Sequence, residues 1–308
     1  MDFKVKPKDL TLDEIKQISG VINGLIWLDI GGGEPFVRDD LYKIIGCFNA
    51  KEISIPTNGW FIDKMISQIK KIDGVIDIKK LILTISIDGL PKTHDMIRKK
   101  RGSFERLKLC FFKIHSLFPN LRIKINTVLN DINFTEIIPL MKLVKNDFQP
   151  DYHSILFLRG SPINPDLKLP SVEKIRELED DIFKIQQDYS YGRKGLARRI
   201  QRNYQSIKRE IANEILDKKT QVIPCLGGQV HLVVYADGNV APCELLPAVG
   251  SLRKRSFDSI LKSQEWADAV DRIKAKECFC THDCNMVENI LYNFKLYPKI
   301  FLENQKTP

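Results

Sequence analysis

The sequence lacks the features that would place it in a membrane or in an export route. Its 308 residues contain no run of about 18 apolar residues, so no transmembrane helix is expected. Residues 1–16, MDFKVKPKDLTLDEIK, hold no apolar segment of the kind that a signal peptide needs. We therefore expect a cytoplasmic protein with no membrane partner.

The sequence also lacks a stripe of aromatic and basic residues that would accompany its 48 lysines and arginines. The formal net charge of +9 would suit an acidic partner, such as nucleic acid or an anionic cofactor. Scattered lysines are more typical of solvated helices. We favour that interpretation, also for the basic segment YGRKGLARRIQRNYQSIKRE at residues 191–210.

No cysteine precedes Cys47 in the sequence. Five of the seven cysteines fall in the last third of the chain, and they are Cys225, Cys243, Cys278, Cys280 and Cys284. Without a secretion signal a disulfide framework is not expected, so clustered cysteines indicate metal ligands. Cys47 and Cys110 lie beside apolar residues in predicted helices, and we expect both in the core.

Apolar strand patterns and helical patterns alternate through the first half of the chain. Strands are predicted at 25–30, 52–56, 81–88, 121–129 and 154–160, and helices at 11–22, 38–48, 60–72, 103–117 and 134–146. Thr11 and Glu14 predict a capping box at the first helix. Strands separated by helices imply a parallel sheet with right-handed crossovers.

Polar motifs follow the predicted strands at or near their carboxyl ends. They are GGGE at 31–34, TNG at 57–59, SIDG at 86–89 and NTVLN at 126–130. In parallel sheets and barrels this is the edge at which ligands bind. The sequence therefore predicts one ligand site along this edge.

The second half of the chain does not continue the alternation of strand and helix patterns. Residues 171–220 are charged and helical, and we interpret them as connecting helices. The segment QVHLVVYADGNVAPCE at 229–244 gives two alternating runs joined at Asp237–Gly238, which predicts a hairpin. A helix and the segment ECFCTHDC follow. We therefore expect three parts, at 1–160, 161–220 and 221–308.

The C-terminal cysteines form the most specific pattern in the sequence. The hairpin can fold Cys225 and Cys243 towards each other, and Cys278, Cys280 and Cys284 can return to the same place. Four thiolates suit zinc or an iron–sulfur cluster. Five cysteines are candidates for four ligand positions, so one of them is not needed or lies beside the ligands without binding the metal.

Taken together, these motifs resemble the radical S-adenosylmethionine (SAM) enzymes. GGGEP, PTNG, SIDG and HDMIR occur in that family's order, and the cysteine-rich end resembles the SPASM domain or the shorter twitch domain. The resemblance implies an α/β fold: a partial (βα)6 barrel missing its first strand, followed by a small domain with a hairpin and a cysteine cluster. It also implies SAM and an auxiliary [4Fe–4S] cluster as cofactors.

The resemblance assigns SAM contacts to residues near the strand ends. Glu34, after the open turn of Gly32 and Gly33, matches the acid beside the SAM ammonium, where a charge-assisted hydrogen bond would fix the orientation. The other matching positions are Thr57 and Asn58 near the methionine moiety, Ser86 and Asp88 near the ribose, Arg98 at the carboxylate, Asn126 at the nucleoside and Leu158 at the adenine.

One motif of the family is absent from these residues. Radical SAM enzymes carry C-x3-C-x2-C after the first strand, and that cluster cleaves SAM, yet no cysteine precedes Gly32 here. We expect that Met1 is an internal methionine and that this chain is N-terminally truncated. A polypeptide of these 308 residues should not cleave SAM reductively, because neither Cys47 nor Cys110 has the spacing to replace the motif.

Three hypotheses about function follow. The first is a radical SAM oxidoreductase or peptide-modifying maturase, with an unknown peptide or small-molecule substrate and a reductant such as flavodoxin or ferredoxin. The second is a non-catalytic iron–sulfur protein that is a degenerate partner of an active homologue. The third is a zinc-stabilised adaptor that binds nucleic acid through its basic helices.

Overall fold

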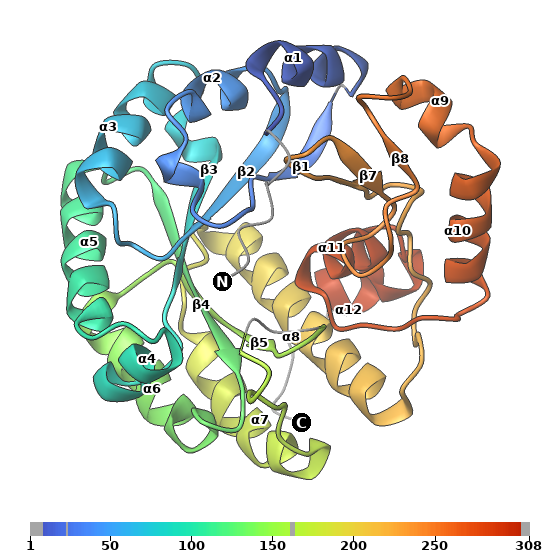
Figure 1. Cartoon of the computed structure of the whole chain (residues 1–308). Coiled ribbons are helices and arrows are strands. Elements are labelled where there is room, and N and C mark those ends of the chain that lie inside the picture. The colour runs from blue at the N-terminus through green and yellow to red at the C-terminus, as the bar shows by residue number, and fades with distance from the viewer. Residues whose placement is uncertain (1–8, 23, 161–163, 303–308) are drawn as a thin grey trace. The chain divides into compact units, whose positions relative to one another are not determined.

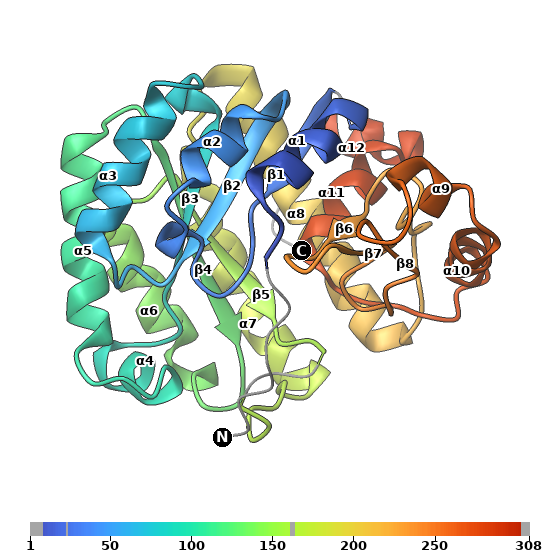
Figure 2. The same ribbon diagram turned by 45° about the horizontal axis from the view of Figure 1, so that its top comes forward.

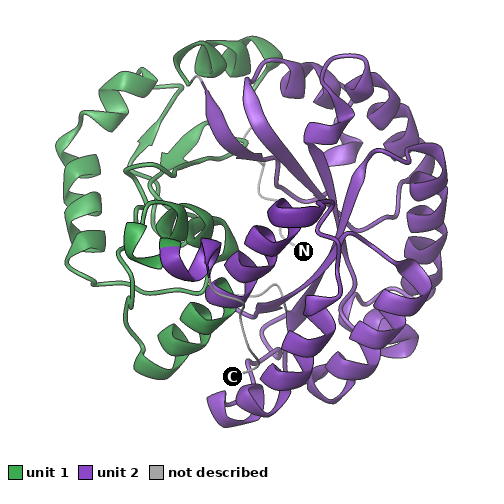
Figure 3. Ribbon diagram, turned by 180° about the vertical axis from the view of Figure 1, so that it is seen from behind, with its two compact units in different colours: residues 1–22, 208–297 green, residues 23–207, 298–308 purple. Residues whose placement is uncertain are grey.

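The chain divides into two compact units, which are coloured separately in Figure 3. The computed structural model describes residues 9–22, 24–160 and 164–302. The sheet unit comprises residues 23–207 and 298–308, and the cysteine unit comprises residues 1–22 and 208–297. Each unit is described by itself. No helix in the described ranges combines the length and the hydropathy that crossing a membrane requires.

Five parallel strands form the sheet unit's central layer, and they follow one another in chain order across a curled sheet (Figure 1). They are β1 (Leu25–Asp29), β2 (Ala50–Thr57), β3 (Leu81–Ser86), β4 (Arg122–Leu129) and β5 (Tyr152–Phe157). All five strands predicted from the sequence are confirmed within a few residues. The curled parallel sheet also confirms the expected partial barrel of the α/β class.

The two faces of the sheet differ in character. In β4 the residues alternate between half-buried and buried, with Lys124 and Asn126 on one face and Ile123 and Ile125 on the other. Ile123 and Ile125 join an apolar core with residues of α3 (Ile62–Asp73) and α5 (Ser103–Leu117). These helices lie along one side of the sheet (Figure 2). The opposite face is the one that carries polar side chains.

The remaining helices of the sheet unit are short or belong to the charged segment. They are α2 (Leu41–Gly46), α4 (Pro91–Ile97), α6 (Ile137–Leu143), α7 (Val172–Gln187), α12 (Tyr297–Phe301) and the first part of α8 (Gly195–Lys218). The helical character predicted for 171–220 is confirmed by α7 and α8. Residues 161–163, with which the predicted connecting part begins, lie outside the described residues.

The cysteine unit is built around a small antiparallel sheet. Strands β6 (Val233–Val234), β7 (Asn239–Ala241) and β8 (Gly250–Ser251) pair in that order. The β6–β7 hairpin confirms the prediction at Asp237–Gly238, where Gly238 has a φ of +87°. Val240 packs with residues of the helices α9 (Phe257–Leu261) and α10 (Gln264–Lys274), and α11 (Asp283–Leu291) follows the cysteine-rich segment.

Helix α1 (Leu12–Val21) groups with the cysteine unit rather than with the sheet. Its predicted capping box is present, since the Thr11 side chain accepts from the Glu14 backbone and the Glu14 carboxylate accepts from the Thr11 backbone. Leu10 donates its backbone N–H to Ala236 O at 2.6 Å. Arg253 forms an ion pair with Glu14 at 3.4 Å. The units are therefore discontinuous in sequence, and their boundaries differ from the expected 1–160, 161–220 and 221–308.

Candidate functional site

Glu34 organises the carboxyl ends of β1 and β2. The Thr57 hydroxyl donates to its carboxylate, with distances of 3.1 and 3.0 Å to the two oxygens, and the Asn58 backbone N–H donates at 3.0 Å. The Phe36 N–H donates at 3.4 Å, from the 3₁₀ turn that follows Glu34. Three of the residues predicted from sequence therefore meet at one half-buried carboxylate.

The glycine turn beside Glu34 leaves its backbone accessible. Gly32 has a φ of +133°, a region that side-chain-bearing residues rarely adopt, so a glycine is favoured there. A Cβ placed on Gly32 or Gly33 would meet no atom within 4 Å. The space above the turn is therefore open, as a closely approaching ligand requires.

Asp88 anchors a second polar group after β3. It accepts from the Val128 backbone at 3.0 Å and pairs with Arg98 at 2.6 Å. Its backbone N–H donates to Nδ1 of the buried His94 at 3.1 Å. Burial lowers the pKa of His94 to about 4, so the ring is neutral and serves as an acceptor. Two predicted residues, Asp88 and Arg98, are thus brought together, with Arg98 already engaged by the carboxylate.

Three polar residues lie side by side on the neighbouring strands β3, β4 and β5. Ser86 of β3 is in register with Asn126 of β4, which is in register with Ser154 of β5. The Asn126 Oδ1 atom is buried and accepts no hydrogen bond from any described residue. Buried acceptors are usually satisfied, so this oxygen has capacity for a ligand donor. Leu158 follows β5 and is half-buried.

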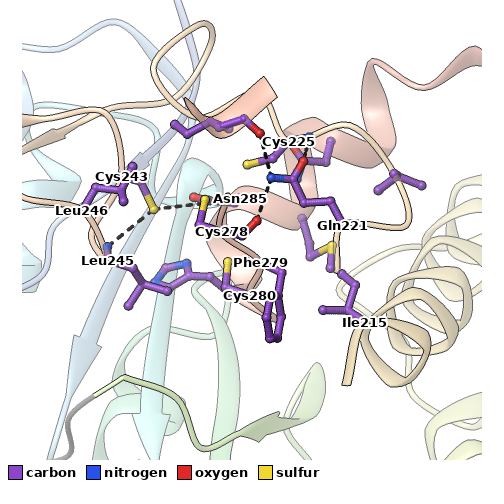
Figure 4. A pocket seen from close by; sticks show the side chains of 15 residues that line it. Ile215, Gln221, Cys225, Cys243, Leu245, Leu246, Cys278, Phe279, Cys280 and Asn285 are labelled. Atoms are coloured by element: carbon purple, nitrogen blue, oxygen red, sulfur yellow. Dashed lines mark hydrogen bonds between the residues drawn. The ribbon is translucent and has the colours of Figure 1, made fainter. Parts of the chain in front are cut away.

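Four of the five C-terminal cysteines line a single pocket in the cysteine unit (Figure 4). They are Cys225, Cys243, Cys278 and Cys280. Cys284 is the second residue of α11 and is not among the described residues that line the pocket. The grouping of all five cysteines as metal ligands stays a prediction.

The thiols of the pocket are close enough to influence one another. Burial raises the pKa of Cys225, and the neighbouring Cys243 raises it further. Burial also raises the pKa of Cys278, with added contributions from Cys225 and Cys243. Thiols in this setting stay protonated until a metal displaces the proton, which is the behaviour of metal-binding cysteines.

The donor set of the pocket is one that both zinc and an iron–sulfur cluster use. Within the described ranges, no group of three or more Cys, His, Asp and Glu is close enough to hold one metal ion. The all-thiol donor set fits an iron–sulfur cluster.

Three buried amide side chains surround the cysteines, and the sequence pattern did not reveal them. Gln221 donates to the carbonyls of Ile273 and Cys278 at 2.9 and 2.8 Å and accepts from the Cys225 N–H at 3.3 Å. Asn285 and Asn289 are described below. His282 also lines the pocket and hydrogen-bonds Glu244 through Nε2. For Asn285 and Asn289, the position after the cysteine-rich segment was the only available signal.

The two remaining cysteines behave differently from each other. Cys110 is fully buried, as expected, and burial raises its pKa to about 12. Cys47 caps the C-terminus of α2, where its thiol donates to Lys43 O at 3.1 Å, and it is only half-buried. The expectation that Cys47 lies in the core is therefore wrong, because the short helix α2 ends at that residue.

Comparison with known proteins identifies the C-terminal part directly. Residues 225–285 match the SPASM family, described as an iron–sulfur cluster-binding domain. The matched segment begins at Cys225 and ends at Asn285, so it contains every cysteine of the pocket.

Three named relatives each match part of the chain. A SAM-dependent nucleotide dehydratase of a Fibrobacter species is 35% identical over 119 residues, which cover 36% of this chain and 33% of the relative. A probable GTP 3′,8-cyclase of Methanococcus vannielii is 30% identical over 185 residues, covering 58% and 57%. A GTP 3′,8-cyclase of Staphylococcus carnosus is 26% identical over 155 residues, covering 47% and 43%.

The chain spans from about a third to somewhat over half the length of these relatives. The SPASM match, the named relatives and the curled parallel sheet agree with one another. Together they confirm the resemblance: this chain is a relative of the radical SAM enzymes and carries a C-terminal SPASM iron–sulfur domain.

Proposed function

We propose that this chain binds SAM at the carboxyl ends of β1–β4 and an auxiliary [4Fe–4S] cluster in the cysteine pocket. The observation that carries the SAM assignment is the Glu34 carboxylate, which Thr57 and Asn58 hold beside an open glycine turn. A half-buried carboxylate next to accessible backbone suits the ammonium of an amino acid ligand.

The other proposed SAM contacts extend from Glu34 across the sheet. The unpartnered Oδ1 of Asn126 would accept from a ribose hydroxyl, with Ser86 beside it in register. Asp88 would reach the ribose as well. Arg98 would have to share its guanidinium between Asp88 and the SAM carboxylate. Leu158 supplies apolar surface for the adenine. These contacts together recognise an adenosyl amino acid.

In the cysteine unit, Cys225, Cys243 and Cys278 are the proposed cluster ligands, and Cys280 is the candidate for the fourth position. A cluster there would supply one-electron chemistry or an iron site for substrate. The alternative occupant is zinc, which the same thiols would bind as a structural ion.

The reaction class follows from the relatives and is also part of the proposal. We propose a cytoplasmic oxidoreductase or maturase-type protein that receives electrons from a flavodoxin or a ferredoxin. The printed names of the relatives favour a nucleotide as its small-molecule substrate. The second candidate is a non-catalytic iron–sulfur protein that acts as a partner of an active homologue.

Equilibrium binding of SAM tests the proposal. The Glu34→Gln substitution removes the charge that faces the ammonium and should weaken SAM binding by about 10- to 100-fold, the range of a charged hydrogen bond. Asp63→Asn removes an exposed carboxylate in the first turn of α3 and should leave binding unchanged.

Two results would count against parts of this proposal. Failure of the wild-type chain to bind SAM, or equal affinity in the Glu34→Gln variant, would remove the SAM site. Formation of 5′-deoxyadenosine from SAM and dithionite would contradict the expectation that these 308 residues do not cleave SAM.

A further inference from the structure

Two cysteines of the pocket lie beside the same two kinds of donor, a backbone N–H and an asparagine side chain. The Cys243 sulfur accepts from the Leu245 backbone N–H at 3.5 Å and from the Asn285 side chain at 3.3 Å. The Gly227 backbone N–H and the Asn289 side chain act on the Cys225 thiol in the corresponding way, and both lower its pKa. Each thiol is thus contacted by the amide two residues further along and by one asparagine.

Both asparagines come from one face of α11. Residues four apart in a helix lie above one another, so Asn285 and Asn289 present their amides in the same direction. Only 3% of Asn285 and 8% of Asn289 is exposed. One helix therefore supplies a donor to each of two cysteines that lie 18 positions apart in the sequence.

The asparagines are held in a way that packing alone does not explain. Asn289 accepts from the Leu226 N–H at 2.8 Å, which leaves its amide N–H groups for the sulfur. The Asn285 Oδ1 atom is buried and has no hydrogen-bond partner within the part of the chain that the structure describes. A buried orphan oxygen costs about 1–3 kcal/mol, a penalty that an apolar residue would avoid. The buried neighbours Met286 and Ile290 show that α11 accepts apolar residues.

We propose that Asn285 and Asn289 are positioning residues that donate N–H···S hydrogen bonds to the Cys243 and Cys225 thiolates and raise the reduction potential of the cluster. This inference rests on the proposed function, since it requires a cluster in the pocket. Reduction adds one electron from an external one-electron donor and no proton, so negative charge on the sulfurs increases. N–H dipoles aimed at the sulfurs stabilise the reduced form more than the oxidised form.

Gln221 has a different part in the same pocket. Its two amide hydrogens go to the carbonyls of Ile273 and Cys278, and its oxygen accepts from the Cys225 N–H. Gln221 therefore ties the backbones of two cysteine-bearing segments together. Its substitution should affect assembly of the site more than the potential.

Redox titration of the reconstituted chain, followed by electron paramagnetic resonance, tests the proposal. The full chain is loaded anaerobically with iron and sulfide and titrated with dithionite. Asn285→Leu and Asn289→Leu should each shift the midpoint potential to more negative values at unchanged iron and sulfide content, and the double variant should shift it further. Asn285→Asp keeps the shape but adds negative charge, so its shift should be the largest of the single variants.

Met286→Leu is the matched control, since Met286 lies on the same helix, is 2% exposed and lines the pocket without a polar group. Its potential should equal that of the wild type. Equal potentials in the asparagine variants, with full clusters, would overturn the inference. Loss of the cluster in every asparagine variant, but not in Met286→Leu, would also overturn it, because the amides would then serve assembly. A wild-type chain that takes up no cluster would instead refute the proposed function.

Discussion

Burial acts on titratable groups in both units, with opposite consequences. In the sheet unit it keeps His94 neutral, and the neutral ring is the form that accepts the Asp88 N–H. In the cysteine unit it keeps the thiols of Cys225 and Cys278 protonated, whereas metal binding requires thiolates. The polar groups of the sheet unit are therefore held in place by the protein itself, whereas the thiols of the cysteine unit must first lose their protons to a metal.

Hydrogen bonding also differs between the sheet unit and the cysteine unit. Glu34 and Asp88 each accept several protein donors, so their orientations are fixed by the fold itself. In the cysteine pocket the donors are aimed at sulfur, a weak acceptor while it is protonated. Those contacts gain strength when the sulfur becomes charged. The cysteine unit should therefore depend on its cofactor far more than the sheet unit does.

Loss of a pocket cysteine should have the largest effect and tests this dependence. Cys225→Ser is expected to reduce bound iron and sulfide to near zero, because the hydroxyl is a poor replacement for a thiolate ligand. Cys47→Ser, in the sheet unit, should retain the wild-type amounts. Iron and sulfide analysis after anaerobic reconstitution measures both. Full iron in Cys225→Ser would show that the pocket is not the cluster site.

Glycine substitutions in each unit test how tightly the surrounding residues are packed. Gly228 has a φ of +74°, and a Cβ there would lie 2.7 Å from Val270 and 2.8 Å from Pro242. Gly228→Ala should cost about 4 kcal/mol of unfolding free energy, from backbone strain plus overpacking. Gly102, in the sheet unit, has a φ of +77° with no atom within 4 Å of its Cβ position. Gly102→Ala should cost only about 1 kcal/mol, from strain alone.

Urea unfolding of both glycine variants, monitored by circular dichroism, measures the difference. Equal losses would mean that the loop around Gly228 relaxes to accommodate the methyl group. The tight contact with Val270 and Pro242 would then not hold the cysteine-bearing segments in place.

The sheet unit was predictable from sequence because its pattern is local and repeated. Each strand is an apolar run, and each polar motif lies at or near a strand end, so parallel pairing places Glu34 and Thr57 at the same edge of the sheet. The two-residue strands β6 and β8 carry too little pattern to predict individually. Asn285 and Asn289 look like ordinary polar helix residues until α11 is seen to face the cysteines.

The placement of α1 shows a further limit of prediction from sequence. Its capping box was predicted because it depends on Thr11 and Glu14 alone. Its membership of the cysteine unit depends on contacts such as Leu10 with Ala236 and Glu14 with Arg253, more than 200 residues away. No periodicity encodes such pairings.

The smallest predicted effect concerns the pH dependence of the sheet unit. The pKa of His94 is lowered by burial from 6.5 to about 4, and that of His153 to about 3 for the same reason. Between these values and 6.5 the unfolded chain binds protons that the folded chain does not. The contribution is therefore fully present above pH 6.5 and is lost as the pH falls, by about 2 kcal/mol for His94 at about pH 5.

His94→Asn should flatten this dependence, because asparagine does not titrate while its oxygen can still accept the Asp88 N–H. The matched control is His115→Asn, at an exposed position of α5, which should keep the wild-type slope. Urea unfolding at about pH 7.5 and pH 5 gives both slopes. An unchanged slope in His94→Asn would mean that the buried ring takes up a proton in the folded state. The sheet unit would then not depend on a neutral histidine, and the contrast with the cysteine unit would rest on hydrogen bonding alone.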